Sequence, residues 1–207
     1  MKRIILILLS ILAIVACDID INDVYIFNSI EMASEKEFVK MDEFWKNKID
    51  YLEHQLTEIS SSLLINNSFD YYVGIVENLI AFLNNVNYYN MGKKCLSHKV
   101  FDSKFSLDYY CPLNVCVDFA EKDLAMYIRN FCDLDVFFEI LNKNTNIDTK
   151  MYFFARMSFP FYYFDELYNV LIDDKEENKL IDIVCNVDNY EEYLQFLEKN
   201  FGFNVFK

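Results

Sequence analysis

Glycine and proline are scarce in this chain, with 3 glycines and 2 prolines among 207 residues. Phosphate-binding loops, dinucleotide-binding turns and the nucleophile elbow of hydrolases need glycines where the backbone takes a positive φ or approaches a ligand closely. Gly74, Gly92 and Gly202 are isolated and match none of these patterns. Tight β-hairpins favour Asn-Gly or Asp-Gly turns, and neither dipeptide occurs. The sequence therefore argues against these sites and against a sheet-rich fold.

Positive charge and histidine are also in short supply. The 19 Lys and Arg residues face 33 Asp and Glu, which gives a net charge of −14. Such a surface repels the phosphates of nucleic acids, so we expect no DNA or RNA partner. The two histidines argue against a histidine-rich catalytic metal site. We expect His54 to be solvated on a charged helix and His98 to lie at the surface beside a disulfide.

Hydrophobic residues, by contrast, are plentiful, at 54% of the chain, and 17% of all residues are aromatic. This is enough apolar material to rule out disorder that arises from the lack of a core. The chain is also long enough for one domain with a substantial core.

The N-terminal segment has the pattern of an export signal. Lys2 and Arg3 precede an apolar run over residues 4–16, and Cys17 follows it. The run is shorter than the about 18 residues that a membrane-spanning helix needs. We therefore expect export of the chain and no transmembrane helix.

Ile14-Val15-Ala16-Cys17 resembles the lipobox of bacterial lipoproteins, a resemblance limited to residues 1–17. It implies that Cys17 becomes the first residue, carries lipid such as palmitate, and anchors the protein to a membrane. The predicted organisation is then a signal peptide over residues 1–16, an acidic tether over 17–33 and a single helical domain over 34–207. The alternative is that Cys17 is an ordinary cysteine of a secreted protein that is cut nearby.

Apolar residues recur at intervals of three and four along most of the chain, which is typical of amphipathic helices. The helices predicted in this way span residues 35–64, 69–89, 113–130, 134–142, 174–185 and 188–201. We expect the first two to pair as an antiparallel hairpin, with a polar break at 66–68 between them. Pro160 should interrupt the aromatic run 151–168, and Gly202 should end the last helix. The predicted fold is an all-α, irregular bundle of about six or seven helices, supported by disulfides.

Five cysteines follow Cys17, namely Cys95, Cys111, Cys116, Cys132 and Cys185. Cys116 and Cys132 would lie about 24 Å apart at opposite ends of one predicted helix. They cannot pair, because a disulfide needs Cα atoms within about 7 Å. We expect Cys95 to pair with Cys111, which would close the irregular connection over residues 93–112, and Cys132 to pair with Cys185. The alternative is that all five are buried reduced thiols.

A weaker alternative for the same region is a zinc site. Cys95, His98, Cys111 and Cys116 supply four ligands of types that could close a tetrahedral site, although their spacing fits only loosely. We otherwise expect no metal and no cofactor.

Four acidic residues lie among apolar neighbours and are the first candidates for a general acid and base: Glu121, Asp123, Asp165 and Glu166. Solvated helix faces explain them as well, and no catalytic pattern is recognised, so we expect no enzymatic activity. The aromatic run from Met151 to Tyr168 exceeds what one helix face can bury. It predicts core packing and, where exposed, a site for a protein or an apolar ligand.

Two functional hypotheses follow. The preferred one is an exported, lipid-anchored helical domain that binds a protein or ligand on the outside of a membrane in the cell envelope. The other is a secreted, disulfide-bonded helical factor of viral or eukaryotic origin that acts on host partners. In that case Asn66, in Asn66-Asn67-Ser68, would be its glycosylation site.

Overall fold

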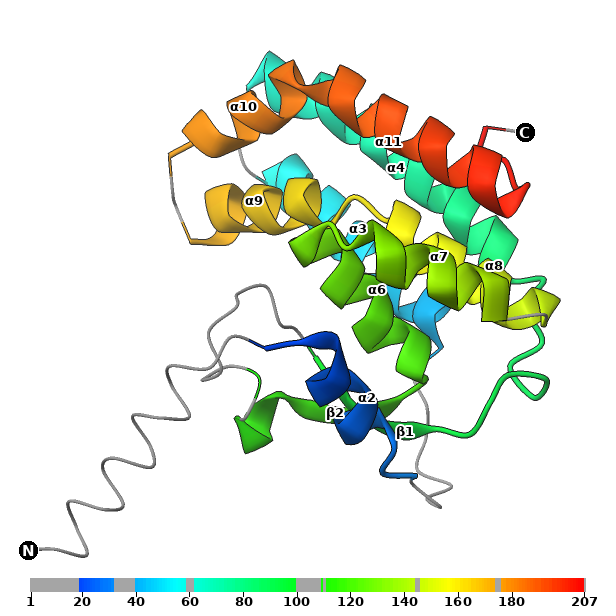
Figure 1. Cartoon of the computed structure of the whole chain (residues 1–207). Helices are drawn as coiled ribbons and strands as arrows, with labels where there is room; N and C mark the ends of the chain where they lie inside the picture. The colour runs from blue at the N-terminus through cyan, green and yellow to red at the C-terminus, as the bar shows by residue number, and fades with distance from the viewer. Residues whose placement is uncertain are drawn as a thin grey trace, which may run out of the picture. The chain divides into compact units, whose positions relative to one another are not determined.

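The computed structural model describes residues 19–31, 40–58, 62–99, 109, 111–143, 146–173 and 176–206. Over these ranges the regular structure consists of nine α-helices, one short 3₁₀ helix and one two-stranded antiparallel sheet (Figure 1). Helices therefore dominate, and the predicted all-α class is confirmed.

The chain divides into two compact units. Unit 1 takes its described residues from Met1–Phe38 and Asn87–Arg156, and unit 2 from Val39–Val86 and Met157–Lys207. Each unit is thus assembled from two separate stretches of the sequence.

Unit 1 contains the sheet and the helices around it. Its elements are α2 (Ile21–Asn28), β1 (Cys95–His98), η1 (Pro112–Asn114), β2 (Val115–Asp118), α6 (Ala120–Phe131), α7 (Leu134–Lys143) and α8 (Ile147–Ser158) as far as Arg156. The strands pair antiparallel, with Cys95 opposite Asp118 and His98 opposite Val115. Helices α2 and α6 both contact β1, and α7 contacts α6. The sheet is thereby held against two helices.

Unit 2 is helical wherever the structure describes regular elements in it. These are α3 (Met41–Glu58), α4 (Leu63–Leu83), α9 (Phe161–Ile172), α10 (Asn178–Cys185) and α11 (Val187–Phe201). Helix α3 contacts both α4 and α9, and α9 contacts α10. Aromatic rings fill the core: Trp45 stacks on Phe159 with ring centroids 4.3 Å apart, and Tyr72 stacks on Tyr163 at 3.8 Å.

The sheet is the main departure from the predicted elements. Residues 95–98 and 115–118 form strands, although we expected an irregular connection over 93–112 and a helix over 113–130. Val115 and Val117 are β-branched and favour an extended strand. The helix begins only at Ala120, where the Asp118 carboxylate accepts a hydrogen bond from the backbone N–H of Phe119.

The two long helices of unit 2 have other bounds than predicted. Helix α3 covers 41–58 of the predicted range 35–64, of which residues 35–39 and 59–61 lie outside the described residues. Helix α4 begins at Leu63 because Ser62 caps it, its side chain accepting a hydrogen bond from the N–H of Ile65. The predicted break at 66–68 is therefore wrong, since these residues lie inside α4.

Two predicted helix boundaries are confirmed. Helix α8 ends at Ser158 and α9 begins at Phe161, so Pro160 separates the two. Helix α11 ends at Phe201, and Gly202 follows in the left-handed conformation with φ 74°. Local backbone chemistry determines both boundaries.

Helix α2 lies within the segment predicted as an acidic tether over 17–33. Asp20 caps it by accepting hydrogen bonds from the N–H groups of Asn22 (2.7 Å) and Asp23 (3.1 Å). Val24 is fully buried. At least residues 21–28 of this segment are therefore packed into unit 1.

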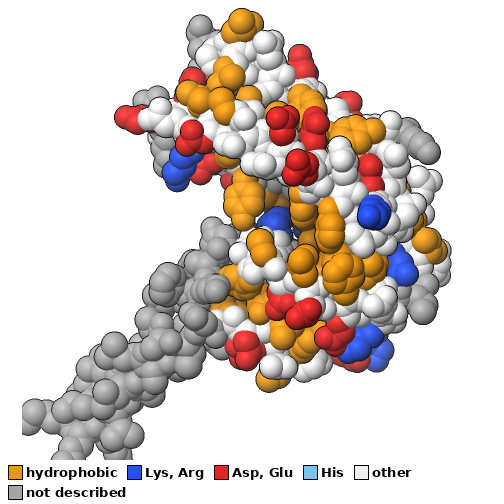
Figure 2. All heavy atoms as spheres, turned by 45° about the horizontal axis from the view of Figure 1, so that its top comes forward, with side chains coloured by type: hydrophobic (Ala, Val, Ile, Leu, Met, Phe, Trp, Pro, Cys, Tyr) orange, Lys and Arg blue, Asp and Glu red, His pale blue; other side chains and the backbone are white. Residues whose placement is uncertain are grey.

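The surface mixes acidic and apolar side chains. Figure 2 shows Asp and Glu side chains distributed among exposed hydrophobic ones on one face of the molecule. None of the helices in the described ranges is both long and apolar enough to cross a membrane.

Gly202 and Gly74 give a matched pair of predictions. An added Cβ would meet no atom within 4 Å at either position, so the backbone conformation decides the outcome. We expect Gly202→Ala to lower the free energy of unfolding by about 1 kcal/mol, because alanine is disfavoured at positive φ. Gly74→Ala, inside α4, should raise it by about 0.5–1 kcal/mol. Urea unfolding measures both, and changes of the same sign would contradict this.

Candidate functional site

The candidate site lies at the two ends of the β-hairpin in unit 1. His98 is the last residue of β1, and Asp118 is the last residue of β2, directly before α6. Both side chains are buried, together with Asp123 in the first turn of α6. The carboxylates of Asp118 and Asp123 are therefore both buried close to the sheet, and each needs hydrogen-bond or charge partners there.

Asp123 accepts four hydrogen bonds. Its Oδ2 is 2.7 Å from His98 Nδ1 and accepts from Asn28 Nδ2 at 3.1 Å. Its Oδ1 accepts from Ser97 Oγ at 2.5 Å and from the backbone N–H of His98 at 2.9 Å. Asp123 and His98 are both 0% exposed. With its lone pairs used in this way, Asp123 serves to hold β1 and α2 against α6.

His98 is further fixed by two aromatic rings. Phe27 and Tyr109 each lie with their ring centroid 4.1 Å from that of His98. The prediction of a surface histidine at this position is therefore wrong, because the ring is enclosed on several sides. His54, in contrast, is exposed on α3 as expected.

Asp118 is bonded by donors from three places in the chain. Its Oδ1 accepts from the backbone N–H of Phe119 at 2.8 Å and from Tyr152 Oη at 2.9 Å. Its Oδ2 lies 3.1 Å from Arg156 Nη2 and 3.4 Å from Lys122 Nζ. The side chains of Asp118, Lys122 and Arg156 are at most 10% exposed. This buried carboxylate is thus compensated by two buried cations.

The neighbours of these charges are arranged to keep them in place. Tyr152 Oη accepts hydrogen bonds from Arg156 Nε (3.1 Å) and Nη2 (2.9 Å). Burial raises the pKa of Tyr152 well above its ordinary value, so the phenol stays neutral and donates to Asp118. Lys122 Nζ also donates to Cys116 Sγ at 3.0 Å. The resulting network is continuous from β2 through α6 to α8.

The zinc alternative gains no support from the arrangement of its four residues. No group of three or more His, Cys, Asp and Glu side chains able to hold a metal occurs among the described residues. His98 directs Nδ1 at Asp123, and burial raises the pKa of the Cys95 thiol to about 12. The two residues are thus engaged in other contacts, His98 with a carboxylate and Cys95 with the backbone carbonyl of Asp118.

The expected disulfides are also not present. Cys95, Cys111, Cys116, Cys132 and Cys185 all carry free thiols. Cys95 is buried, and its Sγ donates to the backbone carbonyl of Asp118 rather than joining Cys111. Cys132 and Cys185 are exposed and belong to different units. The alternative of five reduced thiols fits better, although only one of the five, Cys95, is buried.

The remaining candidate acids have separate surroundings. Glu121 is half-buried, and burial raises the pKa of its carboxyl group. Within unit 2, Asp165 pairs with Lys48 at 2.8 Å and Glu166 with Lys179 at 3.6 Å. Asp165 and Glu166 are thus each engaged in an ion pair with a lysine.

The aromatic run 151–168 is mostly core. Its buried rings are Tyr152, Phe153, Phe154, Phe159, Tyr163 and Phe164. Tyr162 and Tyr168 are 57% and 40% exposed. Asn66, the potential glycosylation site, is exposed on α4, and Ser68 of the same sequon is buried.

The family model described as Spore coat putative kinase YutH matches residues 27–199. The match covers most of the chain, so the chain belongs to this family. Comparison with curated proteins and with solved structures gives no match.

Membership in this family corrects the expected function. The description names a spore coat protein, not an envelope lipoprotein or a secreted factor that acts on a host. Lipid on Cys17, palmitate and a membrane anchor are without support, and residues 1–17 lie outside the described ranges. A position at the outside of a cell is compatible with the description. Because the description also names a kinase, the expected absence of enzymatic activity becomes part of the proposal below.

Asp123→Asn tests the structural role of the centre. The amide would present an N–H group to the donors of Asn28 and His98 and remove the negative charge. We expect a loss of about 2–4 kcal/mol in the free energy of unfolding, measured in urea.

Lys93→Ala is the matched control in the same unit, because it removes an exposed ion pair with Glu31. Exposed pairs contribute little, so its unfolding curve should nearly coincide with that of the wild type. Equal effects of the two substitutions would contradict the assigned role of Asp123.

Proposed function

We propose that this member of the Spore coat putative kinase YutH family is a non-catalytic component of a spore coat. In this proposal the buried centre of unit 1 stabilises the fold and does not support phosphoryl transfer. The order of two short motifs indicates where a kinase-type centre would lie. Two further observations support a structural role for it: the residues at the positions of catalytic groups, and the bonding of Asp118.

Two short sequences are similar to parts of the protein-kinase signature. In that signature a His-Arg-Asp sequence supplies the catalytic base, and an Asn after it and the Asp of a later Asp-Phe-Gly sequence hold Mg²⁺. This chain has His98-Lys99 at the end of β1 and Asp118-Phe119-Ala120 at the end of β2, in the same order. The similarity supports placing a kinase-type centre at the hairpin ends.

The residues at the catalytic positions lack the required chemistry. Counted from His98 without a gap, Val100 takes the place of the catalytic Asp and Phe105 that of the Mg²⁺-binding Asn. Neither side chain has an oxygen that could accept a proton or coordinate a cation. Both lie outside the described residues, so this step depends on the sequence alone.

The bonding of Asp118 carries the proposal. Mg²⁺ requires oxygen ligands in near-octahedral geometry. Both oxygens of Asp118 already accept hydrogen bonds, and Arg156 Nη2 and Lys122 Nζ lie 3.1 and 3.4 Å from Oδ2. A dication at Asp118 would be repelled by these two cations, or would displace them and leave them buried and unpaired. The residues present therefore do not fit a Mg²⁺-nucleotide, and they do fit a structural centre.

Nucleotide binding tests this proposal. A ligand that binds only the folded state raises the Tm by mass action. We expect Mg-ATP and Mg-GTP to leave the Tm of the purified chain unchanged, while a known ATP-binding kinase measured in parallel shows its usual rise. In spores of the source organism, a tagged chain should be recovered in the coat extract.

A saturable rise in Tm together with transfer of labelled phosphate would contradict the non-catalytic assignment, provided that both are lost in a folded Asp118→Asn variant. Recovery of the tagged chain from the membrane fraction and not from the coat would contradict the proposed location.

A further inference from the structure

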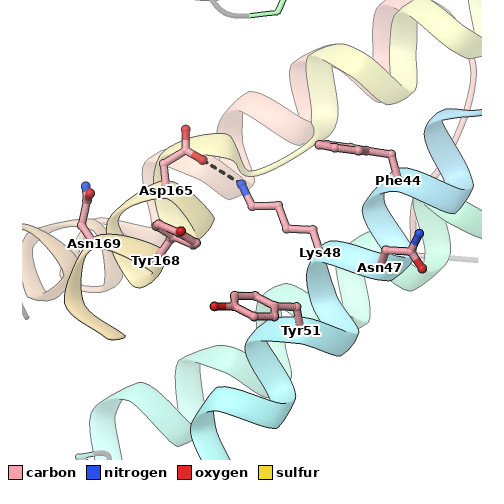
Figure 3. A pocket seen from close by; sticks show the side chains of 7 residues that line it. All are labelled: Phe44, Asn47, Lys48, Tyr51, Asp165, Tyr168 and Asn169. Carbon is pink, nitrogen blue, oxygen red and sulfur yellow. Dashed lines mark hydrogen bonds and ion pairs between the residues drawn. The ribbon is translucent and has the colours of Figure 1, made fainter. Parts of the chain in front are cut away.

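A groove in unit 2 is lined by one face of α3 and one face of α9. Its volume is about 540 Å³, within the range of about 300–1,000 Å³ that is typical of ligand sites. The lining residues are Phe44, Asn47, Lys48, Tyr51, Asp165, Tyr168 and Asn169. Figure 3 shows the first four projecting from α3 and the other three from α9.

The groove face of α3 is distinct from its core face. Met41, Trp45, Ile49 and Leu52 form the buried stripe of this helix. Phe44 and Tyr51 lie off that stripe and are 51% and 44% exposed. With Tyr168 at 40%, three aromatic side chains remain in solvent around one concavity. Exposed apolar surface gathered in this way is typical of an interaction site.

The charged pair in the groove is unequally accessible. Lys48 Nζ donates to Asp165 Oδ1 at 2.8 Å, as the dashed line in Figure 3 marks. The Lys48 side chain is 24% exposed, whereas that of Asp165 is 60% exposed. An incoming group therefore meets the carboxylate more readily than the ammonium group.

Ring faces and an accessible carboxylate both attract cations. The ring centroids of Tyr51 and Tyr168 are 6.5 Å apart, so a flat group can contact either ring from within the groove. A guanidinium group stacks on such rings and bonds a carboxylate through two N–H groups, which an ammonium group cannot do. This chemistry favours arginine over lysine.

The charge of the whole unit favours a basic partner. Residues 39–86 and 157–207 contain 18 acidic and 7 basic side chains, a net charge of −11 out of the −14 of the chain. Long-range attraction would thus bring a basic segment to unit 2. We propose that the α3–α9 groove binds an arginine side chain presented by a basic segment of a partner protein.

The experiment uses the full chain and a fluorescein-labelled peptide of alternating arginine and serine, followed by fluorescence anisotropy. Asp165→Asn and Tyr168→Leu should each weaken binding about tenfold, because each removes one of the two recognition elements. Tyr168→Phe should retain binding, since the ring remains. Asp182→Asn is the matched control: it makes the same charge change at an exposed position on α10, outside the groove, and should stay within about twofold of the wild type.

The peptide chemistry provides a second comparison. Replacing arginine by citrulline keeps the shape and removes the charge, and it should abolish binding. Replacing arginine by lysine should weaken it. Equal losses of affinity in the Asp165→Asn and Asp182→Asn variants would show that the peptide is attracted to the acidic surface in general, and would overturn the proposal. Binding of the citrulline peptide, or preference for an acidic peptide that pairs with Lys48, would also overturn it.

Discussion

Compensation of the buried Asp118 carboxylate is the constraint on which unit 1 depends. Asp118 is 5% exposed, and a charge at such a position is costly unless it is paired and hydrogen-bonded. Arg156 and Tyr152 reach it from α8, and Lys122 reaches it from α6. Because Asp118 ends β2, these bonds join the sheet to two helices. Loss of any one partner would leave the others buried without full compensation.

Asp123 also joins elements of unit 1 through buried hydrogen bonds. Its four hydrogen bonds come from Asn28 of α2, from Ser97 and from two groups of His98, so it joins β1 and α2 to α6. His98 and Asp118, the residues that the proposal compares with the kinase signature, thus both take part in bonds that hold unit 1 together. This arrangement supports the proposal that the buried centre of unit 1 stabilises the fold.

Local signals in the sequence were sufficient to predict the helical class, the break at Pro160 and the end of α11 at Gly202. They were insufficient to predict β1 and β2. A strand of four residues gives little periodicity, and the apolar residues in Val115–Asp118 also continue the helical pattern of α6. The Asp118–Arg156 pair joins residues 38 positions apart and has no local signature. The one indication of the site in the sequence was Asp118-Phe119, which follows a segment rich in β-branched residues. Asp123 was predicted as a candidate general acid or base, but in the structure it is buried next to His98 and its hydrogen bonds hold unit 1 together.

The sequence also contained an indication of the α3–α9 groove, because Phe44 and Tyr51 lie off the apolar stripe of α3.

A double-mutant cycle of Asp118→Asn and Arg156→Met tests the central claim most directly. The free energy of unfolding would be measured in urea for the wild type, both single variants and the double variant. If the two side chains compensate each other in a buried centre, each substitution lowers the free energy of unfolding more in the wild type than in a chain that already carries the other substitution. The coupling energy should then be about 2 kcal/mol or more. Additive losses within about 0.5 kcal/mol would contradict the account.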